Sequence, residues 1–216
     1  MASTHKSSAD FAGYFFAIIF ASKSNSVPAA FWVLANIVAD AGLKAEIERI
    51  IATHYDPESD EFEWTALMED PLIMSCFKET LRLNTNILSG RLVTHDLTLK
   101  VANQSEDDSK NVYPDPMKWI GKRFLDENKG VLIRNADKWR SYAPWGGGGH
   151  ICPGRHLAVY EAVIQLVYTL AQFDVEPIED LPAPIIGDRY GAGMLKPERG
   201  YRVKFTRRKA PLMSVV

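Results

Sequence analysis

The sequence lacks the features that define several common classes of protein. Only two of its 216 residues are cysteine, Cys76 and Cys152, and they lie far apart in the chain. No disulfide framework is therefore expected, and a reducing compartment is favoured. There is no excess of positive charge, because 25 Lys and Arg residues face 27 Asp and Glu residues. The net charge of −2 argues against nucleic acid as the main partner.

Apolar runs are present near the start of the chain, but each is short. Phe11–Ala21 and Val27–Val38 are apolar, and the polar stretch Ser22–Ser26 separates them. Neither run reaches the ~18 apolar residues that indicate a membrane span. The first run, with Lys6 before it, also fits a signal peptide, and that alternative stays open. We expect instead one long, buried helix over 9–40 with a polar notch in its middle.

The remaining predicted elements are mostly helices. Hydrophobic residues make up 46% of the chain and aromatic residues 11%, enough for a sizeable core. Asp70 and Pro71 mark the start of a helix over 70–84, since proline suits the first helical position. The fold class is therefore mainly α with small β-sheets, an α+β protein. Further helices are expected at 43–54 and 155–173, and strands at 87–94, 96–101 and 200–207.

A glycine-rich loop carries the clearest chemical signal. Trp145–Gly154 contains an aromatic residue, four consecutive glycines and one cysteine, and it leads into an apolar helical pattern. Pro153 suits the first turn of that helix. Cys152 would then lie at the helix N-terminus, where the dipole and the free N–H groups favour a thiolate. A thiolate in that position can ligate an iron.

Two other interpretations of the loop stay open. A lone cysteine is usually a small buried hydrophobe, and a glycine-rich loop before a helix often binds phosphate. The Walker form needs Gly-Lys-Ser or Gly-Lys-Thr entering the helix, whereas His150–Cys152 stands here. The dinucleotide form follows a strand, and Ser141–Pro144 is a poor strand. The metal-binding thiolate is therefore the favoured hypothesis.

The loop resembles the cysteine-ligand loop of the cytochrome P450 family of haem-thiolate monooxygenases, usually Phe-x-x-Gly-x-Arg-x-Cys-x-Gly. Trp145 stands for the Phe and His150 for the Arg, while Gly148, Cys152 and Gly154 match. The resemblance implies haem, an iron protoporphyrin, as the cofactor and Cys152 as its axial ligand.

Two further signatures occur upstream in the family's order. Glu79 and Arg82 resemble its Glu-x-x-Arg, and Trp119–Phe124 aligns with its later Phe-x-Pro-x-Arg-Phe. A Glu and an Arg three residues apart on a helix are by themselves usually a weak surface pair. Three motifs in order over most of the chain are a much stronger signal. The resemblance implies that Glu79, Arg82 and Arg123 form a buried structural triad.

Other roles follow from the resemblance by position. Arg91 and His150 would reach the haem propionates; for each, an ordinary surface cation is the alternative. In the helix over 9–40, Ser22 and Asn25 take the catalytic positions, and Asn25 replaces the threonine that helps deliver protons to bound oxygen. This variant resembles the subgroup of sterol 7α-hydroxylases, sterol 12α-hydroxylase and prostacyclin synthase. Alternatively, Ser22 and Asn25 merely bend the helix, with Pro28 completing the kink.

The resemblance also implies an organisation and a function. The chain corresponds to the C-terminal part of a single cytochrome P450 domain, and the N-terminal part and membrane anchor are expected to be absent. The expected function is insertion of an oxygen atom from O2 into an apolar, sterol-like or secondary-metabolite substrate. The partner is an NADPH-dependent reductase, at the cytosolic face of the endoplasmic reticulum membrane. The expected segments are the oxygen helix 9–40, the Glu-x-x-Arg helix 70–84, the meander 113–145, the Cys-ligand loop 145–154 and the following helix 155–173.

Two alternative functions stay open. The chain could belong to a haem-thiolate isomerase or dehydratase that needs neither O2 nor reductase, since the subgroup with asparagine at position 25 includes such an enzyme. It could also be an inactive fragment. Asn86–Leu92 and Tyr190–Leu195 fall at the family's substrate-facing segments, which implies a lipid-like substrate.

Overall fold

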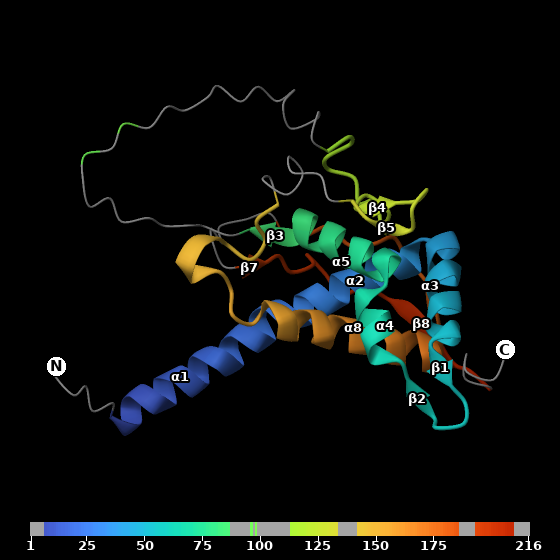
Figure 1. Cartoon of the computed structure of the whole chain (residues 1–216), viewed down its shortest axis with the longest axis horizontal. Helices are drawn as coiled ribbons and strands as arrows, with labels where there is room; N and C mark the ends of the chain where they lie inside the picture. The colour runs from blue at the N-terminus through green and yellow to red at the C-terminus, as the bar shows by residue number, and fades with distance from the viewer. Residues whose placement is uncertain are drawn as a thin grey trace.

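The computed structural model describes residues 7–86, 96, 98, 113–133, 142–185 and 193–209, with the side chain of residue 150 left aside. The described part is mainly helical, with small antiparallel two-stranded sheets (Figure 1), as the sequence predicts. Its helices are α1 Ser8–Ala21, η1 Ser22–Ser26, α2 Val27–Ala39, α3 Ala41–Thr53, α4 Trp64–Glu69, α5 Pro71–Asn84, η2 Gly148–His150 and α8 Arg155–Gln172. Its strands are β1 Tyr55–Asp56, β2 Glu61–Phe62, β3 Thr85–Asn86, β4 Leu125–Asp126, β5 Val131–Leu132, β6 Phe173–Pro177, β7 Gly193–Met194 and β8 Val203–Arg207.

The first three elements form one continuous helix. It begins at a capping box in which Ser7 Oγ accepts from the Asp10 N–H and the Asp10 carboxylate accepts from the Ser7 N–H. It ends at Ala39, because Asp40 is extended and its carboxylate caps α3 by accepting from the Leu43 N–H at 3.0 Å. The polar notch of the sequence forms a π-helical turn, η1, between two α-helical halves.

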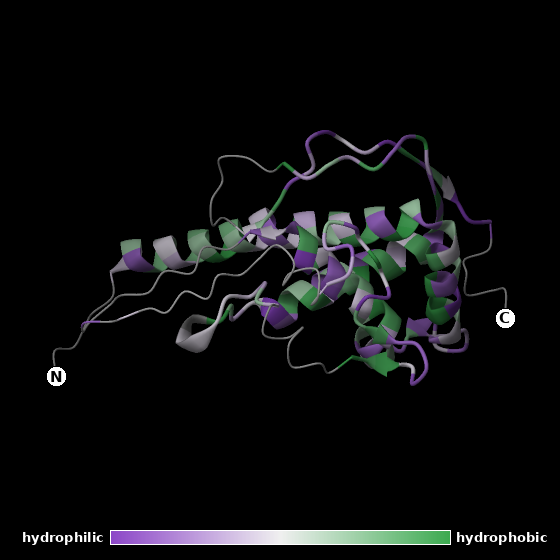
Figure 2. Cartoon of the chain, turned by 90° about the horizontal axis from the view of Figure 1, so that it is seen from above, coloured by the Kyte–Doolittle hydropathy of each residue, from purple (hydrophilic) through white to green (hydrophobic). Residues whose placement is uncertain are grey.

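The expectation that this long helix is buried is wrong for its first half. None of the residues of α1 is buried, and Phe16 is 71% exposed. Figure 1 shows α1 projecting from the helical body, and Figure 2 shows hydrophobic ribbon along it. The physical reason is that no described segment covers α1, whereas α2 packs between α5 and α8. By length and composition, Ser8–Ala39 could cross a membrane, although 28% of its most apolar window is buried.

The core lies where α2, α5 and α8 meet and where α3 closes one end. The buried faces of these helices supply Ile37, Ile47, Ile73 and Leu170, each with no exposed surface. In α5, the Asp70 carboxylate accepts from the backbone N–H groups of residues 72 and 73 at 2.9 Å, which starts the helix where the sequence predicts it. The packing of α2 against α8 brings the loop before α8 close to η1.

Two of the sheets join segments that are far apart in sequence. β6 pairs with β8 over five residue pairs, from Phe173↔Arg207 to Pro177↔Val203. β3 pairs with β7 through Thr85↔Met194 and Asn86↔Gly193, which brings the end of α5 to the chain near position 194. The predicted strand at 200–207 is observed as β8. The strands predicted at 87–94 and 96–101 lie outside the described residues, apart from positions 96 and 98.

Candidate functional site

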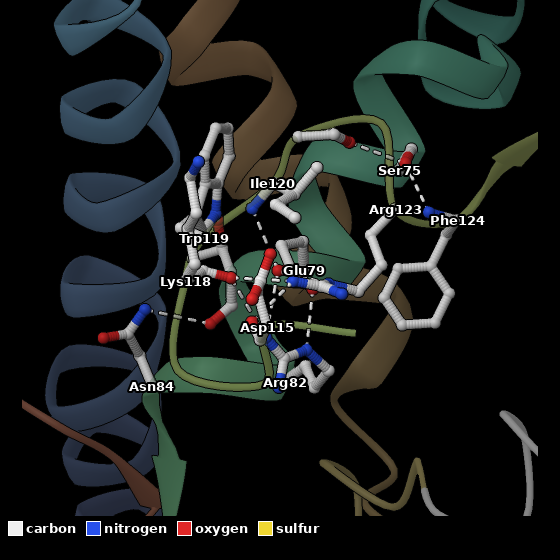
Figure 3. Close-up of polar contacts among 12 residues, drawn as sticks. Ser75, Glu79, Arg82, Asn84, Asp115, Lys118, Trp119, Ile120, Arg123 and Phe124 are labelled. Atoms are coloured by element: carbon white, nitrogen blue, oxygen red, sulfur yellow. Dashed lines mark hydrogen bonds and ion pairs between the residues drawn. The ribbon is translucent and has the colours of Figure 1, made fainter. Parts of the chain in front are cut away.

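The structure brings Glu79, Arg82 and Arg123 together (Figure 3). The Glu79 carboxylate has no exposed surface and accepts from Arg82 Nε at 2.7 Å and from Arg123 Nε at 2.8 Å. It also accepts from the Ile120 backbone N–H at 3.0 Å. The Glu79 carboxylate therefore binds one guanidinium group of its own helix, that of Arg82. It also binds the guanidinium group of Arg123 and the Ile120 N–H, which belong to the segment that begins at residue 113.

The Arg123 guanidinium also binds backbone carbonyls of its own segment. Nη2 donates to the carbonyls of Lys118 at 2.8 Å and Asp115 at 3.1 Å, and Nη1 donates to that of Pro114. The guanidinium thus joins the irregular chain around 114–118 to α5. Losing one member of such a group leaves buried charge uncompensated, at a cost of ~3–5 kcal/mol.

Three further contacts at this junction were not foreseen from the sequence. Ser75 Oγ donates to the Gly121 carbonyl at 2.6 Å and accepts from the Phe124 N–H at 3.0 Å (Figure 3). Trp119 Nε1 donates to Thr80 Oγ1 at 3.1 Å. A Cβ on Gly121 would lie 2.7 Å from a Leu43 methyl carbon and 2.8 Å from the Trp119 ring, so a larger residue there would have to displace these side chains. Ser75 and Thr80, polar residues of α5 near Glu79, were the available signal, but nothing local indicates that they face the segment around residue 120.

Burial around the triad shifts several ionisation equilibria. It raises the pKa of the Tyr142 phenol and, against the charge of Arg82, that of the Tyr113 phenol. It also lowers the pKa of Lys78, whose ammonium lies 5.6 Å from the centre of the Tyr142 ring. The two phenols therefore stay neutral near pH 7 and add no negative charge beside Glu79.

The cysteine loop is shaped by glycines and closed by a backbone hydrogen bond. Gly146 and Gly148 adopt φ values of +72° and +67°, which favour glycine. The Cys152 N–H donates to the Trp145 carbonyl at 2.9 Å, so the two ends of the loop are held together. The Trp145 ring stacks on Phe77 of α5, with ring centres 6.3 Å apart. The loop therefore packs on α5, the helix that also carries Glu79 and Arg82 of the triad.

The prediction that Pro153 lies in the first turn of the following helix is wrong. The helix α8 begins at Arg155 with Gly154 as its N-cap, so Pro153 lies in the turn before it. Gly154 has nothing closer to its missing Cβ than Cys152 Sγ at 3.9 Å. Arg155 Nη1 donates to the Cys152 carbonyl at 3.0 Å and fixes the backbone at the cysteine. The Cys152 thiol therefore projects from a turn just ahead of the helix.

A mostly apolar cavity of about 120 Å³ lies between this loop and the long helix. Cys152 and Asn25 both line it, so the structure brings the predicted thiolate and one of the predicted catalytic positions to the same cavity. Ser22 is not part of the lining, and its hydroxyl donates to the Ile19 carbonyl at 3.0 Å. The other lining residues are Ser26, Ala29, Leu81, Thr85, Pro144, Trp145, Ala158, Gly193 and Met194.

The remaining predicted cofactor contacts fall outside what the structure describes. Arg91 lies outside the described residues, and the description of His150 is confined to its backbone in η2. Of the segments predicted to face substrate, residue 86 and residues 193–195 are described. Of these, Gly193 and Met194 line the cavity.

The cavity brings one sulfur ligand together with apolar side chains, which is the chemistry that a haem-thiolate site needs. Cys152 is partly exposed and faces apolar neighbours, so its sulfur is accessible to such a group. Cys76 is fully buried, and burial raises the pKa of its thiol, so it is unsuited to act as a thiolate. Among the described residues, no group of three or more His, Cys, Asp or Glu side chains could hold a metal ion on its own. A haem bound through one thiolate agrees with this donor set.

Comparison with known proteins points to the same family. The family model named Cytochrome P450 matches residues 5–205. Cytochrome P450 7A1 of Oryctolagus cuniculus is 30% identical over 88% of this chain and 44% of its own length. Cytochrome P450 monooxygenase calL of Penicillium decumbens is 28% identical over 91% of this chain and 42% of its own length. The 7-alpha-hydroxycholest-4-en-3-one 12-alpha-hydroxylase of Homo sapiens is 28% identical over 88% of this chain and 44% of its own length.

The chain therefore spans less than half the length of these curated relatives. The family match extends from before the long helix into the last strand, so it includes the triad and the cysteine loop. The family's cofactor is haem with a cysteine thiolate as axial ligand. With a family match over most of its residues and the three family motifs joined around one core, the chain belongs to the cytochrome P450 family.

Proposed function

We propose that this chain forms the thiolate-bearing part of a haem monooxygenase that inserts one oxygen atom into an apolar, sterol-like or secondary-metabolite substrate. The observation that carries the proposal is the shared cavity, in which Cys152 faces Asn25 across apolar side chains. Two of the relatives described above bear names that specify sterol hydroxylation or a monooxygenase activity. A sterol-like or similarly apolar substrate agrees with the lining of this cavity.

Each residue of the site has a separate task in this proposal. Bound haem supplies the redox chemistry that activates dioxygen. Cys152 would hold the iron, and the loop closed onto the Trp145 carbonyl would keep its sulfur in place. Apolar lining residues exclude water from the cavity. The triad around Glu79 keeps the segment from residue 113 onward against α5. The cysteine loop packs on the same helix through the stacking of Trp145 on Phe77.

The assignments of Arg91 and His150 to the haem propionates stay predictions from the family pattern. So do the partner, an NADPH-dependent reductase, and the location at the cytosolic face of the endoplasmic reticulum membrane. The apolar helix Ser8–Ala39 is compatible with membrane association by composition, although the core helix of a soluble protein meets the same criterion.

A second candidate function has one observation in its favour. Position 25 is asparagine, which has no hydroxyl to deliver a proton, and its side-chain oxygen is already engaged by the Met194 N–H at 2.9 Å. A haem-thiolate isomerase or dehydratase does not need that delivery. The catalytic assignment of Ser22 and Asn25 therefore stays a prediction.

Turnover of sterol substrates tests the choice between the two functions. The haem-loaded protein is supplied with NADPH, reductase and O2, and products are identified by mass. A monooxygenase gives products heavier by one oxygen atom, and only when both NADPH and O2 are present. Products of unchanged mass or products lacking one water, formed without NADPH, would instead identify the isomerase or dehydratase.

A further inference from the structure

The π-helical turn η1 has a local cause in the sequence. Pro28 has no N–H to donate to the Ser24 carbonyl, and its ring crowds that carbonyl in a regular helix. Short polar side chains of the same turn bond other backbone carbonyls of the helix. Asn25 Nδ2 lies 3.4 Å from the Ala21 carbonyl and 3.3 Å from Ser24 Oγ. Single π turns are frequent at functional sites because they redirect a side chain.

In this turn, the side chain of Asn25 reaches the strand β7. Its Oδ1 accepts from the Met194 N–H at 2.9 Å, a bond between positions 169 residues apart. The two hydrogen bonds allow the Asn25 amide only one orientation. A backbone N–H only donates, so it must face the oxygen, and the Ala21 carbonyl only accepts, so it must face the nitrogen. The amide is thus held between the helix and the strand.

The neighbouring glycine fits tightly against the same amide. Gly193 has a φ of +100°, a value that side-chain-bearing residues rarely adopt. A Cβ at this position would lie 2.0 Å from Asn25 Oδ1 and 2.9 Å from Asn25 Cγ. The backbone of β7 therefore approaches the helix closely enough to bond Asn25 because residue 193 is glycine.

Other bonds place this short segment from its remaining sides. Trp32 Nε1, two turns further along the same helix, donates to the Leu195 carbonyl at 2.8 Å. The Leu195 N–H donates to the Asn84 carbonyl at 2.7 Å, and β7 pairs with β3 through Thr85. The Met194 N–H is thus directed to the helix, and Asn25 is its partner. Gly193 and Met194 both line the cavity with Cys152.

We propose that Asn25 is a positioning residue that determines ligand specificity by fixing the Gly193–Met194 wall of the cavity. Its effect on selectivity rests on the proposed function, because an apolar substrate would then share the cavity with the haem that Cys152 would hold. The hydrogen bond itself does not depend on that function. When Asn25 Oδ1 is removed, the wall loses its bond to the helix and the cavity accepts ligands of other shapes.

Amide hydrogen exchange at Met194 in the haem-loaded protein tests the bond. In Asn25→Ala, exchange at Met194 accelerates about three- to tenfold, the factor expected for one lost hydrogen bond. Exchange at Met194 that is unchanged in Asn25→Ala overturns the proposal.

A thermodynamic cycle tests the close approach independently. Gly193→Ala destabilises the protein through its φ in any background, and in the wild-type background also through its clash with Asn25. Its cost is therefore smaller in the Asn25→Ala background. Equal costs in the two backgrounds would contradict the contact. Because both measurements report on the fold, they remain informative even if turnover disproves the proposed function.

Ligand selectivity separates a positioning role from a merely structural one. The dissociation constants of cholesterol and lauric acid are measured by spectral titration of the haem-loaded variants. Asn25→Ala changes the ratio of the two constants by at least threefold. A ratio that stays constant while Met194 exchange accelerates would show that Asn25 stabilises the wall without determining specificity, which refutes the proposal.

Discussion

Replacing Glu79 by alanine is expected to destabilise the protein far more than replacing a similar carboxylate at the surface. Glu79 is fully buried and accepts four hydrogen bonds, two from Arg82, one from Arg123 and one from the Ile120 N–H. Removing it leaves the Arg123 side chain, which is 4% exposed, without its carboxylate partner. The expected loss is ~3–5 kcal/mol of the free energy of unfolding. For a chain of this size that corresponds to a fall in Tm of roughly 6–20 °C.

Glu179 provides a closely matched control. It also binds two arginine side chains, Arg199 at 2.5 Å and Arg202 at 2.9 Å, and it accepts from the Arg202 N–H at 2.9 Å. The difference is exposure, since the Arg202 side chain is 76% exposed. Solvent therefore replaces the lost partner, and Glu179→Ala is expected to change Tm much less.

Denaturant and thermal unfolding of both variants, with haem content measured in parallel, decide the matter. Glu79→Ala is expected to lower both Tm and the yield of haem-loaded protein, and Glu79→Gln to lie between it and the wild type. Equal losses of stability in Glu79→Ala and Glu179→Ala would refute the reasoning, because burial would then have no energetic consequence at the triad.

Three further predictions concern packing, pH and surface. Gly121→Ala is expected to cost ~1–3 kcal/mol of the free energy of unfolding, since its Cβ would overlap Leu43, and urea unfolding measures this. The hydrogen bond from Lys44 lowers the pKa of the Asp174 carboxyl, so its contribution to stability is complete above the ordinary aspartate pKa. That contribution is lost as the pH falls through the lowered pKa, and Tm measured against pH follows the loss, which Lys44→Met abolishes. Phe16→Lys is expected to reduce self-association, measured by light scattering, without lowering Tm, because the ring is 71% exposed.

Each of these predictions has a contrary outcome. Gly147→Ala is the control for the packing change, because nothing lies within 4 Å of its missing Cβ. If it destabilises the protein as much as Gly121→Ala does, the overlap is not the cause. A Tm that falls equally with pH in wild type and Lys44→Met would exclude the Asp174 bond. A lower Tm in Phe16→Lys would mean that α1 packs against the folded body.

The helical framework and the triad could be inferred from the sequence because their signals are local or belong to well-separated motifs. Asp70 before Pro71 is a strong N-terminal signal, and the predicted start of the helix agrees with α5. Glu79 and Arg82 lie one turn apart on one face, so α5 brings them together by its own geometry. The association of Arg123 with them needed the family pattern, because no local rule predicts a contact over 44 residues.

What the sequence did not reveal depends on long-range contacts. The exposure of α1 could not be inferred from its apolar residues, because burial depends on whether another segment covers them. The contact between Asn25 and Met194 joins residues that neither periodicity nor spacing relates. Gly193 carried a weak signal, since a glycine within a strand often marks the close approach of another group. The helix starts at Arg155, as the predicted range 155–173 has it, but Pro153 lies in the turn before the helix and not in its first turn.

The absorption spectrum of the reduced carbon monoxide complex tests thiolate ligation by Cys152 most directly. Haem-loaded wild-type protein is expected to show the red-shifted Soret band typical of a thiolate ligand. Cys76→Ser is expected to keep the band, because that thiol is fully buried and does not line the cavity. Cys152→Ser is expected to abolish it. A red-shifted band that persists in Cys152→Ser would contradict the assignment of Cys152 as the haem ligand.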